Sequence, residues 1–314
     1  MTRKLIINLL IFSLLPVSII GFLFVIPFNK EFGYRFIKDD CYNHASWIYG
    51  RMNNPEGIDI AFIGSSRTIH AIPDSLLEVL IKQRCGNALH VANLGYCRFG
   101  RNFDYEVVKD LLASKQIKNL VVEVREDEDP YSHLDFGYVA SSADVLKPVF
   151  FNTRYFSDFW KALQVRIVLL KSYLHIRPQD FEQRTVALSL YGYGASTEKF
   201  SARQQVPALN SIEPDQGSLL QDMKMNFPEH FISEIAALAS VNNVQLQFVF
   251  LPGFNPVKQM PNAYLFYKKY GTVLIPPAEI FSDPDNFKDE NHLNDSGSTR
   301  LAAWLGSELS CIDN

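Results

Sequence analysis

The stretch IDIAFIGSS, residues 58–66, decides the fold class of this chain. A short apolar run bounded by turn residues is typical of a strand buried inside a sheet, and Gly-Ser is a common turn pair. We therefore predict a buried strand over 59–63 that runs directly into a tight turn. The turn would present Ser65 and Ser66 at the carboxyl end of the strand.

Strand and helix patterns alternate on both sides of this stretch. Further strands are predicted at 88–94, 119–124, 244–251 and 272–275, and helices at 74–84, 105–113, 228–239, 262–270 and 296–309. A βαβ succession requires right-handed crossovers and therefore a parallel sheet. The prediction is an α/β fold: a flavodoxin-like three-layer α/β/α sandwich with a parallel five-stranded sheet.

Residues 126–226 interrupt this alternation. So long a stretch without regular strand and helix patterns indicates an insertion or lid, mainly helical or irregular, with one helix over 161–174. Its aromatic pairs favour a small core of its own, with an apolar acyl pocket or contact with a membrane surface as alternatives; they are Phe150-Phe151, Tyr155-Phe156 and Phe159-Trp160. The α/β domain would then consist of residues 56–125 and 227–314.

The N-terminal residues 5–27 form an apolar run without charges. A helix needs roughly 20 such residues to cross a bilayer, so we predict an N-terminal transmembrane helix. Arg3 and Lys4 precede it, which favours a cytoplasmic N-terminus at 1–4 and a periplasmic or extracellular catalytic domain. A cleaved signal peptide is the alternative, but the run is longer than usual and lacks a small-x-small cleavage site. Residues 28–55 are interpreted as a linker.

The composition limits the classes of partner and cofactor. The 314 residues are 47% hydrophobic and carry a net charge of −4, and no basic stripe suggests a nucleic-acid partner. The four cysteines contain no Cys-x-x-Cys, so a zinc site is not expected; they are Cys41, Cys85, Cys97 and Cys311. In an oxidising compartment they allow three pairings, with free buried thiols as the alternative. His133, after the acidic run 126–129, is assigned to a solvated loop rather than to a metal site.

Two motifs suggest catalytic chemistry. Ser66 follows the first strand, and Asp289-x-x-His292 precedes the last helix. A serine hydroxyl needs a base to become a nucleophile, and the base and its orienting carboxylate need only meet it in space. Both motifs lie where an open α/β sheet places its active site, outside the carboxyl ends of the strands. Taken singly, the first is also a common turn and the second a common solvated helix cap.

These motifs resemble those of the SGNH (GDSL-type) hydrolases. Gly64-Ser65-Ser66 is similar to the first block of that family, Asn93-Leu94-Gly95 to the second, and Asp289-x-x-His292 to the last. The resemblance covers the α/β part but not the insertion. It implies that Ser66 is the nucleophile, that His292 is the base oriented by Asp289, and that the Ser66 and Gly95 N–H groups bind the oxyanion.

The chain departs from the family pattern at two places. Ser65 replaces the usual Asp of the first block, and the third block, Gly-x-Asn-Asp, is absent after the third strand. Glu123 or Arg125 takes the position of that Asn, and only Arg125 can donate hydrogen bonds to an oxyanion. Arg67, beside the nucleophile, would either bind an anionic or glycan group or pair with an acidic residue.

The departures and the predicted anchor resemble those of membrane-anchored SGNH-like proteins, such as the D-alanyl transfer protein of teichoic acid modification and alginate O-acetylation proteins. The resemblance implies a serine esterase or O-acyltransferase that acts on acyl esters of a cell-envelope or secreted glycan without a cofactor. The alternative is a catalytically silent SGNH-like module that binds glycan or partners a membrane O-acyltransferase.

Overall fold

A computed structural model describes residues 2–37, 44–147, 152–175, 190–200 and 219–311. Its five strands form one sheet in which every pairing is parallel; they are β1 (Ile60–Ile63), β2 (Val91–Asn93), β3 (Asn119–Val124), β4 (Gln245–Phe250) and β5 (Thr272–Leu274). The order β2-β1-β3-β4-β5 is that of flavodoxin-like doubly wound sheets. The predicted α/β class and parallel five-stranded sheet are confirmed.

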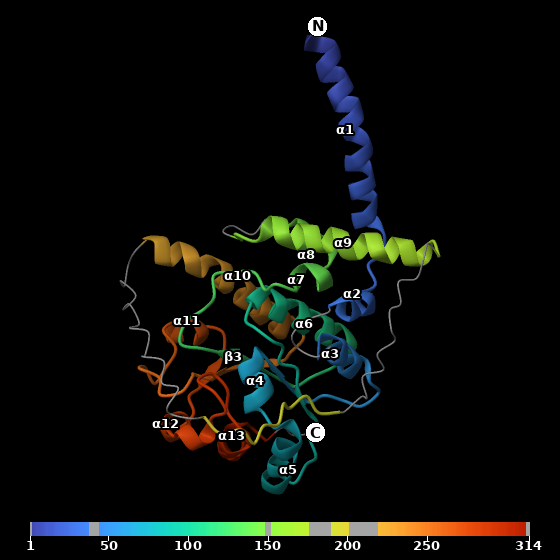
Figure 1. The fold of residues 1–314 in the computed structure, drawn as a ribbon. Helices are drawn as coiled ribbons and strands as arrows, with labels where there is room; N and C mark the ends of the chain where they lie inside the picture. The colour runs from blue at the N-terminus through green and yellow to red at the C-terminus, as the bar shows by residue number, and fades with distance from the viewer. Residues whose placement is uncertain (1, 38–43, 148–151, 176–189, 201–218, 312–314) are drawn as a thin grey trace.

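Helices cover both faces of this sheet (Figure 1). One face packs against α3 (His44–Asn53), α6 (Arg101–Ser114) and α10 (Leu219–Val241), and the other against α5 (Asp74–Cys85), α12 (Ala278–Ser282) and α13 (Asp295–Glu308). Side chains alternate along a strand, so Ala61 and Ile63 enter the first core whereas Ile60 and Phe62 enter the second. These are the three layers that the sequence predicts.

The register of the central strands positions the functional residues. Ile63 at the end of β1 pairs with Val122 of β3, and Glu123 pairs with Val249 of β4. The turn that follows β1 therefore lies beside Glu123, at the carboxyl edge of the sheet.

The segment predicted as a linker, 28–55, instead contains two helices, α2 (Lys30–Phe36) and α3. Both pack on the α/β domain, because Tyr34 of α2 and Ile48 of α3 are fully buried in its core. Before them, α1 (Thr2–Val25) projects from the domain (Figure 1). Among the described residues, no helix on its own has the length and hydropathy of a membrane span. Ile11–Val25 and Lys30–Phe36 reach that threshold only together, with a bend of 106° between them.

The insertion contains α7 (Phe136–Val139), α8 (Ser142–Leu146) and α9 (Tyr155–Tyr173), and α10 begins near its end. The insertion has a small core separate from the two cores of the sheet, as predicted, but shares it with α1: Phe136, Ala162 and Leu163 pack with Leu23 and Phe24, and Phe159 packs against this cluster. The Phe159 ring stacks on Phe24 of α1 with 5.3 Å between centroids, whereas Phe156 and Trp160 are exposed. The pair Phe150-Phe151 lies outside the described residues.

The cysteines that the structure describes are all disulfide-bonded, so the alternative of free thiols is wrong for them. Cys85 at the end of α5 is bonded to Cys311 after α13, across 226 residues of sequence. Cys97 is also disulfide-bonded. Cys41 lies outside the described residues.

Candidate active site

The turn after β1 presents Ser66 at the start of a short helix, α4 (Ser66–Ala71), that the sequence analysis did not predict. Ser65 caps this helix, because its Oγ accepts a hydrogen bond from the N–H of Arg67 at 3.0 Å. Gly64 is required before it: a Cβ there would lie 2.3 Å from Thr68 Oγ1 and 2.4 Å from Glu123 Cβ. The turn is therefore as tight as the Gly-Ser-Ser motif indicates.

The Asp-x-x-His motif occupies a small loop before α13. Phe287 and Leu293 form an antiparallel bridge at its base. At its tip, Asp289 Oδ1 accepts hydrogen bonds from the N–H groups of Asn291 at 2.9 Å and His292 at 3.0 Å. This local turn holds the carboxylate next to the imidazole of the same motif.

The structure brings Ser66, His292 and Asp289 together. His292 Nε2 lies 2.8 Å from Ser66 Oγ, and His292 Nδ1 lies 2.8 Å and 2.9 Å from the two Asp289 oxygens. Burial alone would raise the pKa of Asp289, but the hydrogen bonds from His292 and Asn291 lower it below its ordinary value. Asp289 therefore stays ionised, and the three groups are placed for proton transfer from the serine hydroxyl to an oriented imidazole.

A buried carboxylate holds the turn that carries Ser66. Glu123 of β3 is fully buried and accepts hydrogen bonds from the N–H and Oγ of Ser65 and from the N–H and Oγ1 of Thr68, at 2.6 to 3.1 Å. Burial would raise the pKa of Glu123, but the charges of Arg125 and Arg67 and these hydrogen bonds lower it to about 2. Glu123 is thus an ionised anchor for the turn rather than an oxyanion donor.

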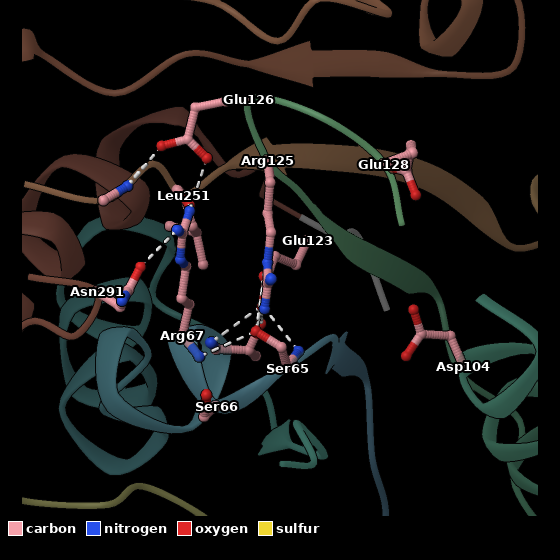
Figure 2. Close-up of polar contacts among 12 residues, drawn as sticks. Ser65, Ser66, Arg67, Asp104, Glu123, Arg125, Glu126, Glu128, Leu251 and Asn291 are labelled. Atoms are coloured by element: carbon pink, nitrogen blue, oxygen red, sulfur yellow. Dashed lines mark hydrogen bonds and ion pairs between the residues drawn. The ribbon is translucent and has the colours of Figure 1, made fainter. Parts of the chain in front are cut away.

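Arg125 lies beside this anchor and reaches the same turn. Its Nε donates to Glu123 at 2.8 Å, and its guanidinium carbon lies 4.2 Å from the centre of the Phe99 ring. Its side chain, 19% exposed, extends toward Ser65 (Figure 2). Neither of its Nη groups donates to an acceptor within the described ranges. Arg125 is therefore an oriented cation whose Nη groups keep N–H donors available to a ligand.

Arg67 has a different environment and takes the second of its two predicted roles. Its Nη1 donates to Glu126 at 2.8 Å and to the Leu251 carbonyl at 2.9 Å, and its Nη2 donates to Asn291 at 2.9 Å (Figure 2). Because Asn291 belongs to the Asp-x-x-His loop, Arg67 ties the nucleophile helix to the loop that carries the base. Few N–H donors of Arg67 therefore remain for binding an anionic group.

The acidic run 126–129 is only partly the solvated loop that its composition predicts, because Asp127 and Asp129 are exposed whereas Glu128 is buried. Glu126 pairs with Arg67, and Glu128 is buried between Arg101 and the hydroxyl of Tyr267. His133, after the run, is buried and accepts the Asp135 N–H at Nδ1 while its Nε2 faces the Cys97 carbonyl. The charges of Glu126 and Glu128 are thus neutralised by arginines that are distant in sequence.

Gly95 lies next to the nucleophile helix, as the second motif predicts. A Cβ at this position would be 3.0 Å from both the Ser65 carbonyl oxygen and the Ile69 nitrogen. However, the N–H of Gly95 donates to the Asn93 side chain at 3.1 Å. In this structure its N–H group is therefore occupied, and its role as an oxyanion donor stays a prediction.

His70, which belongs to none of the sequence motifs, also lies in the site. Its ring packs edge-on against His292, with 5.2 Å between centroids. Burial, with smaller contributions from the Lys288 and His292 charges, lowers the pKa of His70 to about 4. The neutral ring donates from Nδ1 to the Gly194 carbonyl and accepts the Lys288 ammonium at Nε2, 2.9 Å away. No sequence spacing links partners so far apart in the chain.

No protein-family model matches the sequence, and no curated protein is significantly similar to it.

The role of Glu123 predicts a specific pH dependence of stability. Its pKa of about 2 lies below the ordinary 4.5, so the carboxylate stabilises the fold above pH 4.5 and loses that contribution as the pH falls toward 2. We expect Glu123→Gln to lower the free energy of unfolding by about 3 kcal/mol at neutral pH, and the deficit to shrink below about pH 4.5. Urea unfolding across this range measures it.

The matched control is Glu279→Gln, an exposed carboxylate in the first turn of α12. This substitution should leave the free energy of unfolding nearly unchanged at every pH. A Glu123→Gln deficit that does not vary with pH, or that equals the control, contradicts an ionised anchor at Glu123.

Proposed function

We propose that this chain is a membrane-anchored, extracytoplasmic SGNH-like serine esterase or O-acyltransferase that acts on acyl esters of a cell-envelope or secreted glycan. One observation carries the proposal: His292 Nε2 lies 2.8 Å from Ser66 Oγ while Asp289 contacts the opposite ring nitrogen. A turn and a helix cap that are unrelated in function would not need this alignment.

The proposed reaction proceeds through an ester on Ser66. Ser66 Oγ forms a bond to the acyl carbonyl carbon as its proton passes to His292 Nε2, and Asp289 stabilises the imidazolium. The tetrahedral intermediate then expels the alcohol, which takes the proton from His292 and leaves the acyl group on Ser66. Water or a sugar hydroxyl attacks this ester in the second half, again with His292 as base. The first acceptor gives hydrolysis and the second gives transfer.

The negative charge on the carbonyl oxygen needs donors in a site that lacks the family Asn. Arg125 supplies a guanidinium whose Nε is held by Glu123 and whose plane rests on Phe99. The N–H of Ser66, at the start of α4, donates no hydrogen bond to the described part of the chain. We assign the oxyanion to these two groups, with Arg125 in place of the missing amide.

The proposed location follows from the N-terminus and the disulfide. Apolar side chains of α1 are exposed along its length, for example Phe12, Leu15 and Val25 at 79%, 67% and 82%. The disulfide between Cys85 and Cys311 favours an oxidising compartment such as the periplasm or the cell exterior. Together they support a helix anchor with the α/β domain outside the cytoplasm.

A catalytically silent module is the second candidate, and a specific observation favours it. The N–H of Gly95 donates to Asn93, so one expected oxyanion donor is occupied, and the third motif is absent. Such a module would bind an acylated glycan or partner a membrane O-acyltransferase without forming an ester itself.

Labelling with a fluorophosphonate separates the two candidates. The full-length protein should be labelled, and Ser66→Ala and His292→Ala should each abolish labelling because they remove the nucleophile and its base. Ser75→Ala and His90→Ala, which change two exposed residues on the same domain, should be labelled like the wild type. Absence of labelling in folded wild-type protein would favour the silent module.

The assignment of Arg125 makes a separate kinetic prediction. Arg125→Met should lower kcat for a soluble aryl ester by about 10²–10³ with little change in KM, because the lost donor acts mainly in the transition state. Arg300→Met, which removes an exposed arginine of α13 that pairs with Asp283, is the control and should keep full activity. A wild-type kcat in a correctly folded Arg125→Met protein would exclude Arg125 as an oxyanion donor.

A further inference from the structure

The helix α9 lies across the base of α1 (Figure 1). Leu23 and Phe24 of α1 are buried there against Ala162 and Leu163 of α9. Arg166 is buried in the same junction, with its guanidinium carbon 4.6 Å from the Phe24 ring centre. One side of α9 is therefore fixed by packing and hydrogen bonds, and its orientation relative to α1 is set.

The side of α9 that contacts α1 also carries exposed apolar side chains beyond this contact. Phe156, Trp160 and Leu174 are 84%, 57% and 58% exposed, and Lys171 is also exposed. Their helical spacing places all four on one face of α9, together with Leu163, which lies between them and packs against α1. Asp158, Val165 and Leu169 on the other face are buried. We call these four residues the outer stripe. Large exposed apolar side chains on one helical face, here Phe156, Trp160 and Leu174, mark a contact surface rather than a solvated face.

We propose that α9 lies in the interfacial layer of the bilayer that α1 crosses, with the outer stripe against lipid. This inference rests on the membrane anchorage that is part of the proposed function. The exposed apolar surface of α1 continues to Val25, which directly follows Leu23 and Phe24 of the junction with α9. Because α1 projects from the side of the domain on which α9 lies, α9 and the lower end of α1 are at the same level (Figure 1).

The residue types of the outer stripe fit a lipid interface. Tryptophan concentrates at the boundary between headgroups and acyl chains, and an amphipathic helix in this layer buries its apolar face among them. Lys171 can extend its ammonium toward headgroup phosphates while its methylene groups stay in the apolar layer. A protein partner on the stripe would have to share this layer with the lipid around α1, so we assign the surface to the bilayer.

This placement also orients the active site. The helices α6 and α10 lie between α9 and the sheet, and α4, which carries Ser66, lies on the far side of them (Figure 1). With α9 on the lipid, the triad is held away from the bilayer surface. The acyl ester that it meets would then belong to a glycan that extends from the membrane, rather than to lipid chains within it.

Depth-dependent quenching of Trp160 fluorescence tests the proposal. The full-length chain and Trp160→Phe are placed in vesicles of phosphatidylethanolamine and phosphatidylglycerol whose acyl chains carry bromine either near the headgroups or near the chain ends. The difference between the two proteins isolates Trp160, since Trp47 is buried and Trp304 lies on α13. We expect a blue-shifted Trp160 signal that loses most of its intensity with bromine near the headgroups and little with bromine at the chain ends.

Three results would count against the proposal. A Trp160 signal typical of water and unaffected by bromine means that α9 is solvated. A blue-shifted signal without quenching, together with crosslinked dimers, means that a second copy covers the outer stripe. Protein that does not sediment with vesicles refutes the anchorage itself, which is part of the proposed function, and therefore also removes the basis for an interfacial α9. The Ser66 labelling assay is independent of all three.

Discussion

The buried carboxylate of Glu123 is the interaction on which the active-site geometry depends. An ionised group inside a protein is tolerated only when hydrogen bonds and opposite charge replace water, and the Ser65–Thr68 turn and Arg125 provide both. The arrangement suits a serine, and not a carboxylate, at position 65. A carboxylate at position 65 would face Glu123 within hydrogen-bond distance, and like charges so close disfavour ionisation of both groups. Ser65 instead donates its hydroxyl proton to Glu123.

The two halves of the site are joined by contacts that cross the molecule. Arg67 connects the nucleophile helix to the Asp-x-x-His loop through Asn291. On the other side, residues 190–200 of the insertion contact both α4 and the start of α13, just after the loop: the Gly194 N–H donates to the Ile69 carbonyl, and the Tyr193 hydroxyl donates to Asp295. The insertion thus helps to fix the relative positions of Ser66 and His292, which lie on opposite ends of the α/β domain in sequence.

Sequence patterns predicted the parts of the structure that depend on local or periodic signals. The strands over 59–63 and 119–124 could be predicted because both faces of a central parallel strand are apolar. Ser66, Asp289 and His292 could be named because the carboxyl ends of such strands meet at one edge. The helices of 28–55 and the short α4 could not be predicted, because they are stabilised by tertiary packing rather than marked by a strong periodic pattern.

The side-chain partners were the least predictable part of the site. Arg67 pairs with Glu126, and the His70 ring accepts a hydrogen bond from Lys288, only because the fold brings these residues together. The same holds for the N–H of Gly95, which a neighbouring side chain occupies. Motif spacing specifies which residues approach the site, whereas the three-dimensional contacts decide which of their donors and charges remain available to a substrate.

The central claim is that Ser66 accepts an acyl group with His292 as its base. The most direct measurement is mass spectrometry of the full-length protein after brief reaction with an aryl acetate and quenching in acid. The account predicts one acetyl group, located on the peptide that contains Ser66 and absent from His292→Ala. Acetylation of a different residue, or equal acetylation of Ser66 in His292→Ala, would contradict it.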